Sequence, residues 1–411
     1  MQLVAYGAQD VYLTGNPKVT FFQAVYRRHT NFAMENIEQT VNGTPSNNGR
    51  VSVTVARNGD LIADMYVQLK SKKDVAETSG ANVDCLWLAE RAIKDVELSI
   101  GGQRIDKHYQ RWWRLYAELY LDESKKANWS KMTTPGFTVN TETTVYLPLI
   151  FFFNRNPGLA LPLIALQYHE VRIDFDLSSE FSTYTDGSTF RVWGNYVYLD
   201  TEERRRFAQK GHEYLIEQLQ HTGVDSLKPG SIAQIRLSYN HPVKELVWCA
   251  DRGSVSHANL WNFTSKDVTL TSNIAKESNV LMSTCHSGTP LILRDAGDGS
   301  WTEETAGPVE TFKLVLNGQD RFKEQEGKYF NQVQTYQHHT GSPMPGIYSY
   351  SFALKPEEHQ PTGTCNFSRI DNAQVVVKSK TGATATSLNM FAVNYNVLRI
   401  QSGMGGLAFS N

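Results

Sequence analysis

Two groups of residues in this sequence could in principle hold a metal ion. The adjacent pair His338 and His339 offers two imidazole ligands, but neighbouring residues of a strand point to opposite faces, and no third ligand suggests itself. Residues 295–299, Asp-Ala-Gly-Asp-Gly, resemble a calcium-binding loop, yet their spacing does not match D-x-[DN]-x-[DN]-G with a distal glutamate. We therefore predict a polar surface turn at residues 295–299 and no metal site.

Patterns of catalytic and cofactor-binding residues are also missing from the sequence. It contains no GxxxxGK[ST], no HExxH and no GxSxG. Residues 403–406, Gly-Met-Gly-Gly, are rich in glycine, but no helix is expected after them to present N–H groups to a phosphate, so a flexible or tight turn is predicted. The widely spaced Cys85, Cys249, Cys285 and Cys365 form no CxxC pair and are predicted to be reduced and mostly buried. We predict no catalytic residue, no cofactor and no enzymatic activity.

A few residues are candidates for contacts with other molecules. Arg27 and Arg28 form a basic cluster near the N-terminus that could meet an acidic partner or a phosphate surface, although a solvated turn would also explain them. Asn262 lies in an N-x-[ST] sequon within a long polar stretch, and it is the candidate glycosylation site. Trp261 and Trp301 lie in the same stretch and are predicted to be exposed, where they could stack on a sugar ring.

Composition and charge describe an ordinary globular chain. Of its 411 residues, 40% are hydrophobic and 11% are aromatic, which favours sheet, and the formal net charge is −2. Proteins that grip DNA phosphates usually carry a basic excess, so no direct sequence-specific nucleic-acid binding is predicted. The first residues lack the pattern of a signal peptide, and the longest apolar stretches are shorter than the ~20 residues that span a bilayer. We expect a soluble protein made in the cytosol.

Short strand patterns separated by turn residues dominate the chain. Apolar residues alternate with polar or small ones over 51–55, 96–100 and 171–175, as in half-buried strands. Helix signals are few: apolar residues spaced i, i+3, i+4 and i+7 predict one amphipathic helix over about 108–121, and Asp200 begins a second, shorter one. Many short strands with turns between them indicate an all-β sandwich or barrel.

An internal repeat divides the chain. Residues 97–106 resemble residues 313–322, each with a strand, a turn containing glycine and a glutamine, and residues 195–199 resemble 394–398 in the same order. A tandem duplication explains these matches, because repeated units of similar sequence adopt similar structures.

The repeat predicts two domains of similar fold. We place an N-terminal segment and the first domain at 1–211 and the second domain at 212–411, with the boundary at Gly211 and His212. The second contains the long polar stretch 251–308, which is predicted to be an exposed, elaborated loop.

Several motifs together resemble one protein family. They include residues 3–17 (Leu-Val-Ala-Tyr-Gly-Ala-Gln-Asp-Val-Tyr-Leu-Thr-Gly-Asn-Pro), 148–154 (Pro-Leu-Ile-Phe-Phe-Phe-Asn), 316–322 (Leu-Asn-Gly-Gln-Asp-Arg-Phe) and 402–408 (Ser-Gly-Met-Gly-Gly-Leu-Ala). The sequence is similar to the major capsid proteins of nucleocytoplasmic large DNA viruses, above all those of algal and amoebal viruses. The motifs run along nearly the whole chain, and the departures lie in polar stretches such as 251–308.

The resemblance implies a double jelly roll, which consists of two tandem eight-stranded antiparallel β-sandwiches with a few short helices in loops. It also implies homotrimers of pseudo-hexagonal outline that tile an icosahedral shell over an internal lipid membrane, which the chain does not span. Minor capsid proteins and a vertex (penton) protein are the other implied partners. The N-terminal segment would lie on the inner face, with Arg27 and Arg28 toward those partners or the membrane. The protein would be a virion component, made and assembled in the host cytoplasm.

Two other classes of function stay open from the sequence. Jelly rolls often bind sugars, so a carbohydrate-binding or host-attachment module using Trp261 and Trp301 is the alternative. A jelly-roll enzyme of the cupin type would need a clustered His/Glu metal site, which the sequence does not offer.

Overall fold

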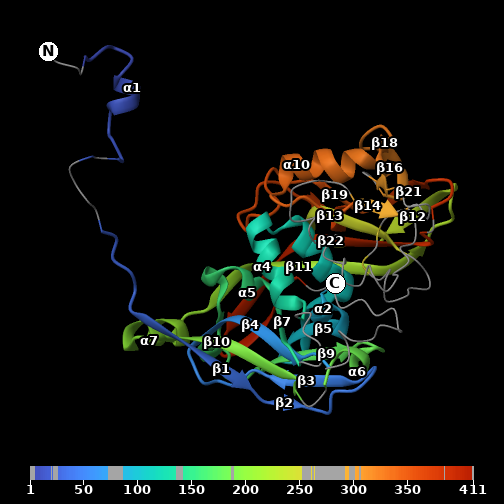
Figure 1. The fold of residues 1–411 in the computed structure, drawn as a ribbon. Coiled ribbons are helices and arrows are strands. Elements are labelled where there is room, and N and C mark those ends of the chain that lie inside the picture. The colour runs from blue at the N-terminus through green and yellow to red at the C-terminus, as the bar shows by residue number, and fades with distance from the viewer. Residues whose placement is uncertain are drawn as a thin grey trace.

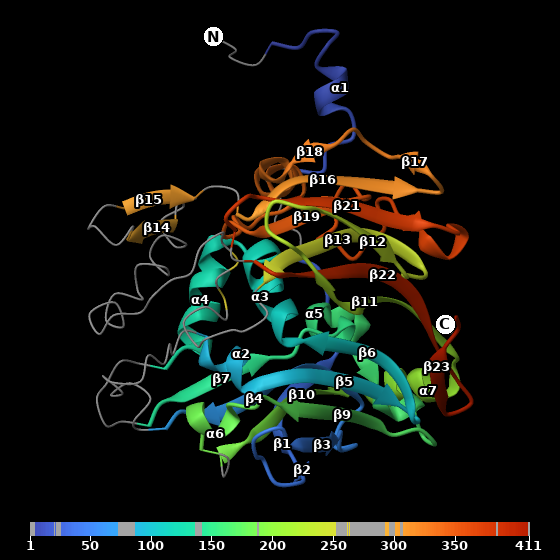
Figure 2. The same ribbon diagram turned by 90° about the vertical axis from the view of Figure 1, so that its right-hand side faces the viewer.

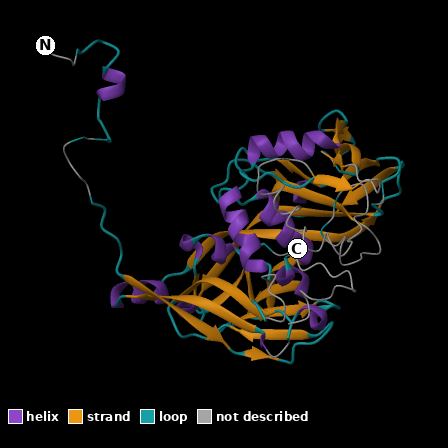
Figure 3. Cartoon of the chain, viewed as in Figure 1, coloured by secondary structure: helices purple, strands orange, loops and turns teal. Residues whose placement is uncertain are grey.

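The chain folds into two β-sandwiches and an N-terminal arm (Figure 1). Most of its described residues lie in antiparallel strands joined by turns and short helices (Figure 3). The computed structural model describes residues 5–19, 21, 26–72, 87–135, 142–186, 189–251, 261, 263, 292–295, 301–304, 307–383 and 385–409.

The first sandwich uses strands from the N-terminal half. Four strands form one sheet in the order β1-β10-β4-β7, and four form the facing sheet in the order β3-β9-β5-β6. Their bounds are β1 (Phe32–Gln39), β3 (Arg50–Thr54), β4 (Leu61–Lys70), β5 (Ile93–Ile100), β6 (Gln103–Tyr109), β7 (Thr144–Pro148), β9 (Val171–Leu177) and β10 (Arg191–Leu199), with short β2 (Val41–Asn42) beside β3 and β8 (Leu161–Pro162) beside β4.

The second sandwich repeats this plan strand for strand. Its sheets run β11-β22-β13-β19 and β12-β21-β16-β17, and each strand holds the sheet position of its counterpart in the first. The predicted double jelly roll is therefore confirmed. The bounds are β11 (His212–Ser226), β12 (Ile232–Leu237), β13 (Pro242–Asp251), β16 (Val309–Leu316), β17 (Gln319–Asp320), β19 (Ile347–Ser351), β21 (Ala373–Ser379) and β22 (Ser387–Gln401), with short β18 (Gln325–Glu326), β20 (Cys365–Asn366) and β23 (Met404–Leu407).

The sequence repeat corresponds to real structural equivalence. The β5–β6 hairpin turns at Gly101 and Gly102, with φ of 58° and 82°, and the β16–β17 hairpin turns at Asn317 and Gly318, with φ of 52° and 78°. Two successive residues with positive φ define the tight turn that matches strand twist, and only glycine and asparagine adopt it readily. The second match, 195–199 with 394–398, falls on the equivalent strands β10 and β22.

Helices fill equivalent connections in the two jelly rolls. α3 (Gln110–Leu119) and α4 (Glu123–Thr133) lie between β6 and β7, and α3 confirms the predicted amphipathic helix. η6 (Tyr329–Val333) and α10 (Gln334–His338) precede β19, the counterpart of β7. The remaining helices among the described residues are α1 (Val11–Thr14), α2 (Leu88–Ala92), α5 (Phe152–Arg155), η2 (Pro157–Leu159), η3 (Leu163–Ala165), α6 (Phe181–Tyr184), α7 (Thr201–Gln209) and η7 (Phe367–Arg369).

The predicted boundary falls between the two sandwiches. Helix α7 begins after Asp200, whose side chain accepts a hydrogen bond from the backbone N–H of Glu203, and it ends at Gln209. The last strand of the first sandwich ends at Leu199, and the first strand of the second begins at His212. A division at residue 211 into separately folding units stays a prediction.

The predicted long loop is only partly described. Within 251–308 the structure places Trp261 and Phe263 and a hairpin of β14 (Ile292–Asp295) and β15 (Trp301–Glu304). Asp295 ends β14, and the rest of the calcium-like segment 296–299 lies outside the described residues.

The N-terminal arm leads away from both sandwiches (Figure 1). It reaches β1 from residue 5 and carries the short helix α1. Its described side chains are exposed apart from the half-buried Asp10, and they include large apolar ones: Tyr12 is 91% and Tyr26 is 90% exposed. Isolated apolar residues are common on surfaces, but a whole segment of them indicates a partner.

Candidate functional site

The two jelly rolls share a seam formed by the outer face of sheet β11-β22-β13-β19, the face that points away from its own core. Strands β13 and β22 are buried on both faces over most of their length. Trp248 and Met390 point into the core of the second sandwich, whereas Cys249 and Phe391 join the core of the first. The two halves therefore form one packed body, with helices α3, α4 and α5 between the sheets (Figure 2).

Helix α3 and the residue before it supply the first jelly roll's side of this seam. The rings of Tyr109 and Trp112 lie 6.2 and 5.8 Å from the ring of Phe391. Arg111 Nε lies 2.5 Å from Asp251 Oδ2 on β13. Because α3 presents aromatic rings on one side and a cation beside them, it holds the second sheet by both burial and charge.

A buried ionic cluster closes the seam near α5. Glu217 on β11 lies 2.7 Å from Arg155 Nη2 and 2.6 Å from Lys244 Nζ, and His359 Nδ1 is 3.7 Å away. Burial alone would raise the pKa of Glu217, but Arg155, His359 and Lys244 hold that pKa well below its usual value. Burial lowers the pKa of Lys244 to about 8, against the effect of Glu217. The carboxylate is thus charged and neutralised by cations from both jelly rolls.

His338 and His339 lie at the end of helix α10, so the prediction that they alternate along a strand is wrong. The helix turns His339 inward, where Nε2 lies 2.8 Å from Glu245 and Nδ1 lies 3.2 Å from Glu357. Burial would lower the pKa of this imidazole, but the two carboxylates raise it to about 9. Among the residues that the structure describes, no group of three His, Cys, Asp or Glu side chains is placed to hold a metal ion.

The C-terminal strand β23 fastens the second half of the chain onto the first. Leu407 donates its N–H to Gln103 Oε1 at 3.1 Å, and Tyr168 donates its N–H to the carbonyl of Gly403 at 3.0 Å. Gly403 has a φ of 79°, and a side chain there would strike the ring of Tyr168. The glycine-rich segment 403–406 is therefore a tight turn followed by a strand. Of the flexible or tight turn predicted from the sequence, the structure shows the tight one.

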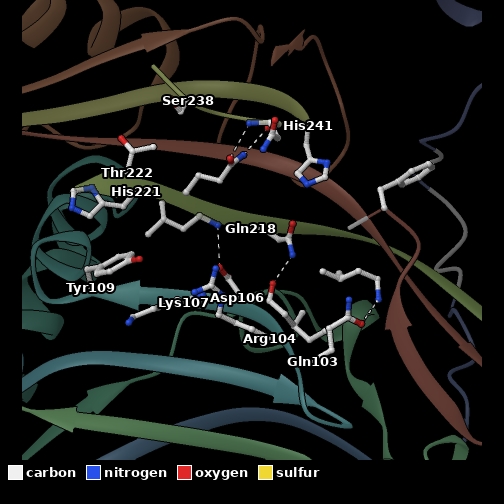
Figure 4. A pocket seen from close by; sticks show the side chains of 16 residues that line it. Gln103, Arg104, Asp106, Lys107, Tyr109, Gln218, His221, Thr222, Ser238 and His241 are labelled. Atoms are coloured by element: carbon white, nitrogen blue, oxygen red, sulfur yellow. Dashed lines mark hydrogen bonds between the residues drawn. The ribbon is translucent and has the colours of Figure 1, made fainter. Parts of the chain in front are cut away.

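A polar cavity of about 390 Å³ opens beside the seam (Figure 4). Residues of β6 and β11 line opposite sides of it, and several of their polar groups bond to each other. Gln218 donates to the carbonyl of Ile105, and Gln220 exchanges two hydrogen bonds with the backbone of Asn240. Side chains of β11 in the lining are thus held by backbone carbonyls on two sides, those of Ile105 and Asn240.

The structure corrects one of the predicted contact residues. Trp261 is only 5% exposed: it belongs to the core of the first sandwich, and the guanidinium groups of Arg91 and Arg111 lie over its ring, at 5.9 and 5.2 Å from the ring centroid. Stacking of cations on an indole ring stabilises a buried tryptophan. It is therefore not an exposed aromatic for sugar binding.

The other predicted residues are not brought together into one site. Arg27 and Arg28 are exposed on the N-terminal arm. Trp301 is the first residue of strand β15, in the β14–β15 hairpin. Asn262 lies outside the described residues. Among the described residues, no helix is long and apolar enough to cross a membrane.

Two equivalent jelly rolls that pack on each other along a buried seam, with an exposed N-terminal arm, define a protein of the double jelly-roll class. The chain belongs to the family of major capsid proteins of large eukaryotic DNA viruses. The model described as "Large eukaryotic DNA virus major capsid protein" matches residues 203–406, and the model "Major capsid protein N-terminus" matches residues 20–200. Its function is that of a major capsid protein, a component of the virion.

Relatives and solved structures agree with this assignment. The chain is 45% identical to the major capsid protein of Paramecium bursaria Chlorella virus 1, over 100% of this chain and 99% of the relative. It is 42% identical to that of Phaeocystis pouchetii virus, again over 100% and 99%. The crystal structure of PBCV-1 VP54 superposes with a TM-score of 0.78 at 41% identity, over 95% of this chain and 100% of that one. The Faustovirus major capsid protein shares the fold at 14% identity, with a TM-score of 0.70, 96% of this chain and 94% of that one.

Proposed function

We propose that this protein assembles as a homotrimer of pseudo-hexagonal outline, and that these trimers tile an icosahedral shell. The observation that carries the proposal is the equivalence of the two jelly rolls, because three chains then supply six similar units around one axis. The similarity to a chain of the quasi-atomic structure of the PBCV-1 virus capsid, with a TM-score of 0.78 at 40% identity, supports it.

Light scattering of the purified native protein tests the trimer. We expect a stable species at three times the 46.4 kDa of one chain that persists on dilution. A monomer at all concentrations would contradict the proposal, because two jelly rolls would then lack the assembly that explains their equivalence. Ordered arrays in electron microscopy would test the lattice itself.

The N-terminal arm is proposed to face inward, where Arg27 and Arg28 contact minor capsid proteins or the surface of an internal membrane. The support is the exposed apolar and basic character of the arm, which suits docking onto another layer. A vertex protein closing the shell and assembly in the host cytoplasm belong to the same proposal. Finding the arm on the outer surface of assembled particles would contradict it.

Sugar binding and glycosylation on the outer surface form a second, smaller part of the proposal. The sugar-binding alternative loses Trp261, which is buried, and keeps only Trp301. Asn262 is proposed as a glycan acceptor, and mass spectrometry of virion-derived protein tests it by the mass of the peptide that contains residue 262.

A further inference from the structure

Each jelly roll has one sheet whose outer face could be covered by a neighbouring jelly roll, and only one of these two faces is covered within the chain. Within the chain, the α3 connection of the first jelly roll covers the outer face of sheet β11-β22-β13-β19 of the second. The first jelly roll has the equivalent sheet β1-β10-β4-β7, and its outer face is not covered in the same way by any described element. Helix α7 packs through Phe207 at one end of it, beside Val197 and Leu199.

This uncovered surface is rich in aromatic and amide side chains. We define it as the outer sheet face, formed by Met34, Tyr66, Gln68, Tyr146 and Trp193. Trp193 donates to Gln68 Oε1 at 2.7 Å, and the rings of Tyr66 and Tyr146 meet edge to face at 5.7 Å. Met34 on the edge strand β1 is 54% exposed. Aromatic and methionine side chains are enriched in interfaces, and the partly exposed ion pair of Arg191 with Glu38, at 3.8 Å, lies beside them on β10 and β1.

The second jelly roll carries the matching uncovered element. Helix α10 follows η6 in the connection equivalent to that of α3 and α4, and it lies on the side of the second sandwich away from the first (Figure 1). Val333 and Tyr336 project from this region, and Tyr336 is 89% exposed. Leu354 is also exposed, and its carbonyl accepts a hydrogen bond from Nδ1 of His338, at the end of the helix, at 3.0 Å. We define Val333, Tyr336 and Leu354 as the α10 patch.

We infer that the α10 patch of one copy packs onto the outer sheet face of a second copy. The contact would repeat between chains the relation that α3 has to β22 within a chain, with Tyr336 in the role that Trp112 has against Phe391. Such a head-to-tail contact uses two different surfaces, so it closes into a ring when the rotation allows. Each chain adds two equivalent units, and three chains complete six. The inference rests on the proposed trimer and identifies the residues that hold it.

Charge placed on either surface should separate the subunits. In Tyr336→Lys or Met34→Lys, an ammonium group would be buried in the contact without a partner. We therefore expect the protein concentration at which the trimer dissociates to rise about tenfold or more. Tyr336→Phe keeps the ring and should remain trimeric. Tyr12→Lys, at an exposed tyrosine of the N-terminal arm that belongs to neither surface, is the charge-matched control. Light scattering over a dilution series measures all four, and circular dichroism checks that each is folded.

The outcomes separate this inference from the proposed function. Trimeric wild type with weakened Tyr336→Lys and Met34→Lys supports both. Trimeric wild type with both lysine variants as stable as Tyr12→Lys overturns the assigned surfaces and leaves the proposed trimer unaffected. Monomeric wild type overturns the proposed function, and this inference with it.

Discussion

Lys244 Nζ lies 2.6 Å from Glu217 Oε1, and both side chains are buried where the two jelly rolls meet. Arg155 of the first jelly roll approaches the other oxygen of the same carboxylate at 2.7 Å. One glutamate thus neutralises a cation from each half. Removing one partner of such a group leaves a buried charge uncompensated, which costs far more than losing an exposed ion pair.

Glu217→Gln should therefore destabilise the protein by about 3–5 kcal/mol, because Lys244 and Arg155 then share no counter-charge. Urea unfolding followed by tryptophan fluorescence measures the change. Glu213→Gln is the matched control on the same strand: its pair with Arg399 is exposed on both sides, and it should change the free energy of unfolding by at most about 1 kcal/mol. Equal effects of the two substitutions would mean that the seam does not depend on this cluster.

His339 predicts a specific dependence of stability on pH. Its pKa is raised from 6.5 to about 9 in the folded chain, so the folded state binds the proton more tightly than the unfolded state does. The stabilisation is fully present below about pH 6.5 and is lost as pH rises through 9, by up to about 3 kcal/mol.

The variant His339→Gln should remove that loss. Unfolding midpoints between pH 6 and 9.5 would show a smaller decline for the variant than for the wild type. Burial depresses the pKa of Lys244 to about 8, which makes stability rise with pH between about 8 and 10.5 in both proteins, so the difference between them is the quantity to compare. Parallel curves would show that Glu245 and Glu357 do not hold the imidazole charged.

Gly101 and Gly102 offer a matched pair of substitutions in one turn. Both have positive φ, but a Cβ at Gly101 would overlap the ring of His169, whereas nothing lies within 4 Å of a Cβ at Gly102. Gly102→Ala should cost about 1 kcal/mol for backbone strain alone, and Gly101→Ala should cost about 1–3 kcal/mol more because His169 must move. Thermal unfolding measures both, and a reversed order would contradict the described packing.

The N-terminal arm should be dispensable for folding. Deleting residues 1–31 should leave the unfolding midpoint and the number of subunits in the trimer unchanged, because nearly all described side chains of the arm are exposed. The same deletion, and Arg27→Glu with Arg28→Glu, should reduce co-sedimentation with vesicles of anionic phospholipid if the arm meets a membrane surface. Lys18→Glu in the arm is a single-charge control. A large drop in stability on deletion would show that the arm packs on the body.

Local signals in the sequence predicted the repeated parts of the fold well. The turn at Gly101 and its counterpart at Asn317 could be found because positive φ demands particular residues. A further signal was available: residues 388–393 form a nearly continuous apolar run, whereas the equivalent strand β10 alternates, and this contrast marks the sheet buried on both faces.

Contacts between distant residues could not be predicted in this way. His339 meets Glu245 across 94 residues, and only the packing of α10 on β13 and β19 brings them together. Trp261 was expected to be exposed because its sequence neighbours are polar, but its burial depends on Arg91 and Arg111, more than one hundred residues earlier.

The attachment of β23 also imposes an order on the making of the molecule. His169 and Gly405, which bond to each other at the foot of the seam, are 236 residues apart. At roughly 5–20 residues per second, the ribosome needs on the order of ten to fifty seconds to travel between them. During that interval the first jelly roll can already have formed its sheets while Ile100 and Leu166 wait for Gly405 to cover them. The nascent chain thus exposes this apolar surface until the C-terminal segment has been synthesised, and chaperones could bind it during that interval.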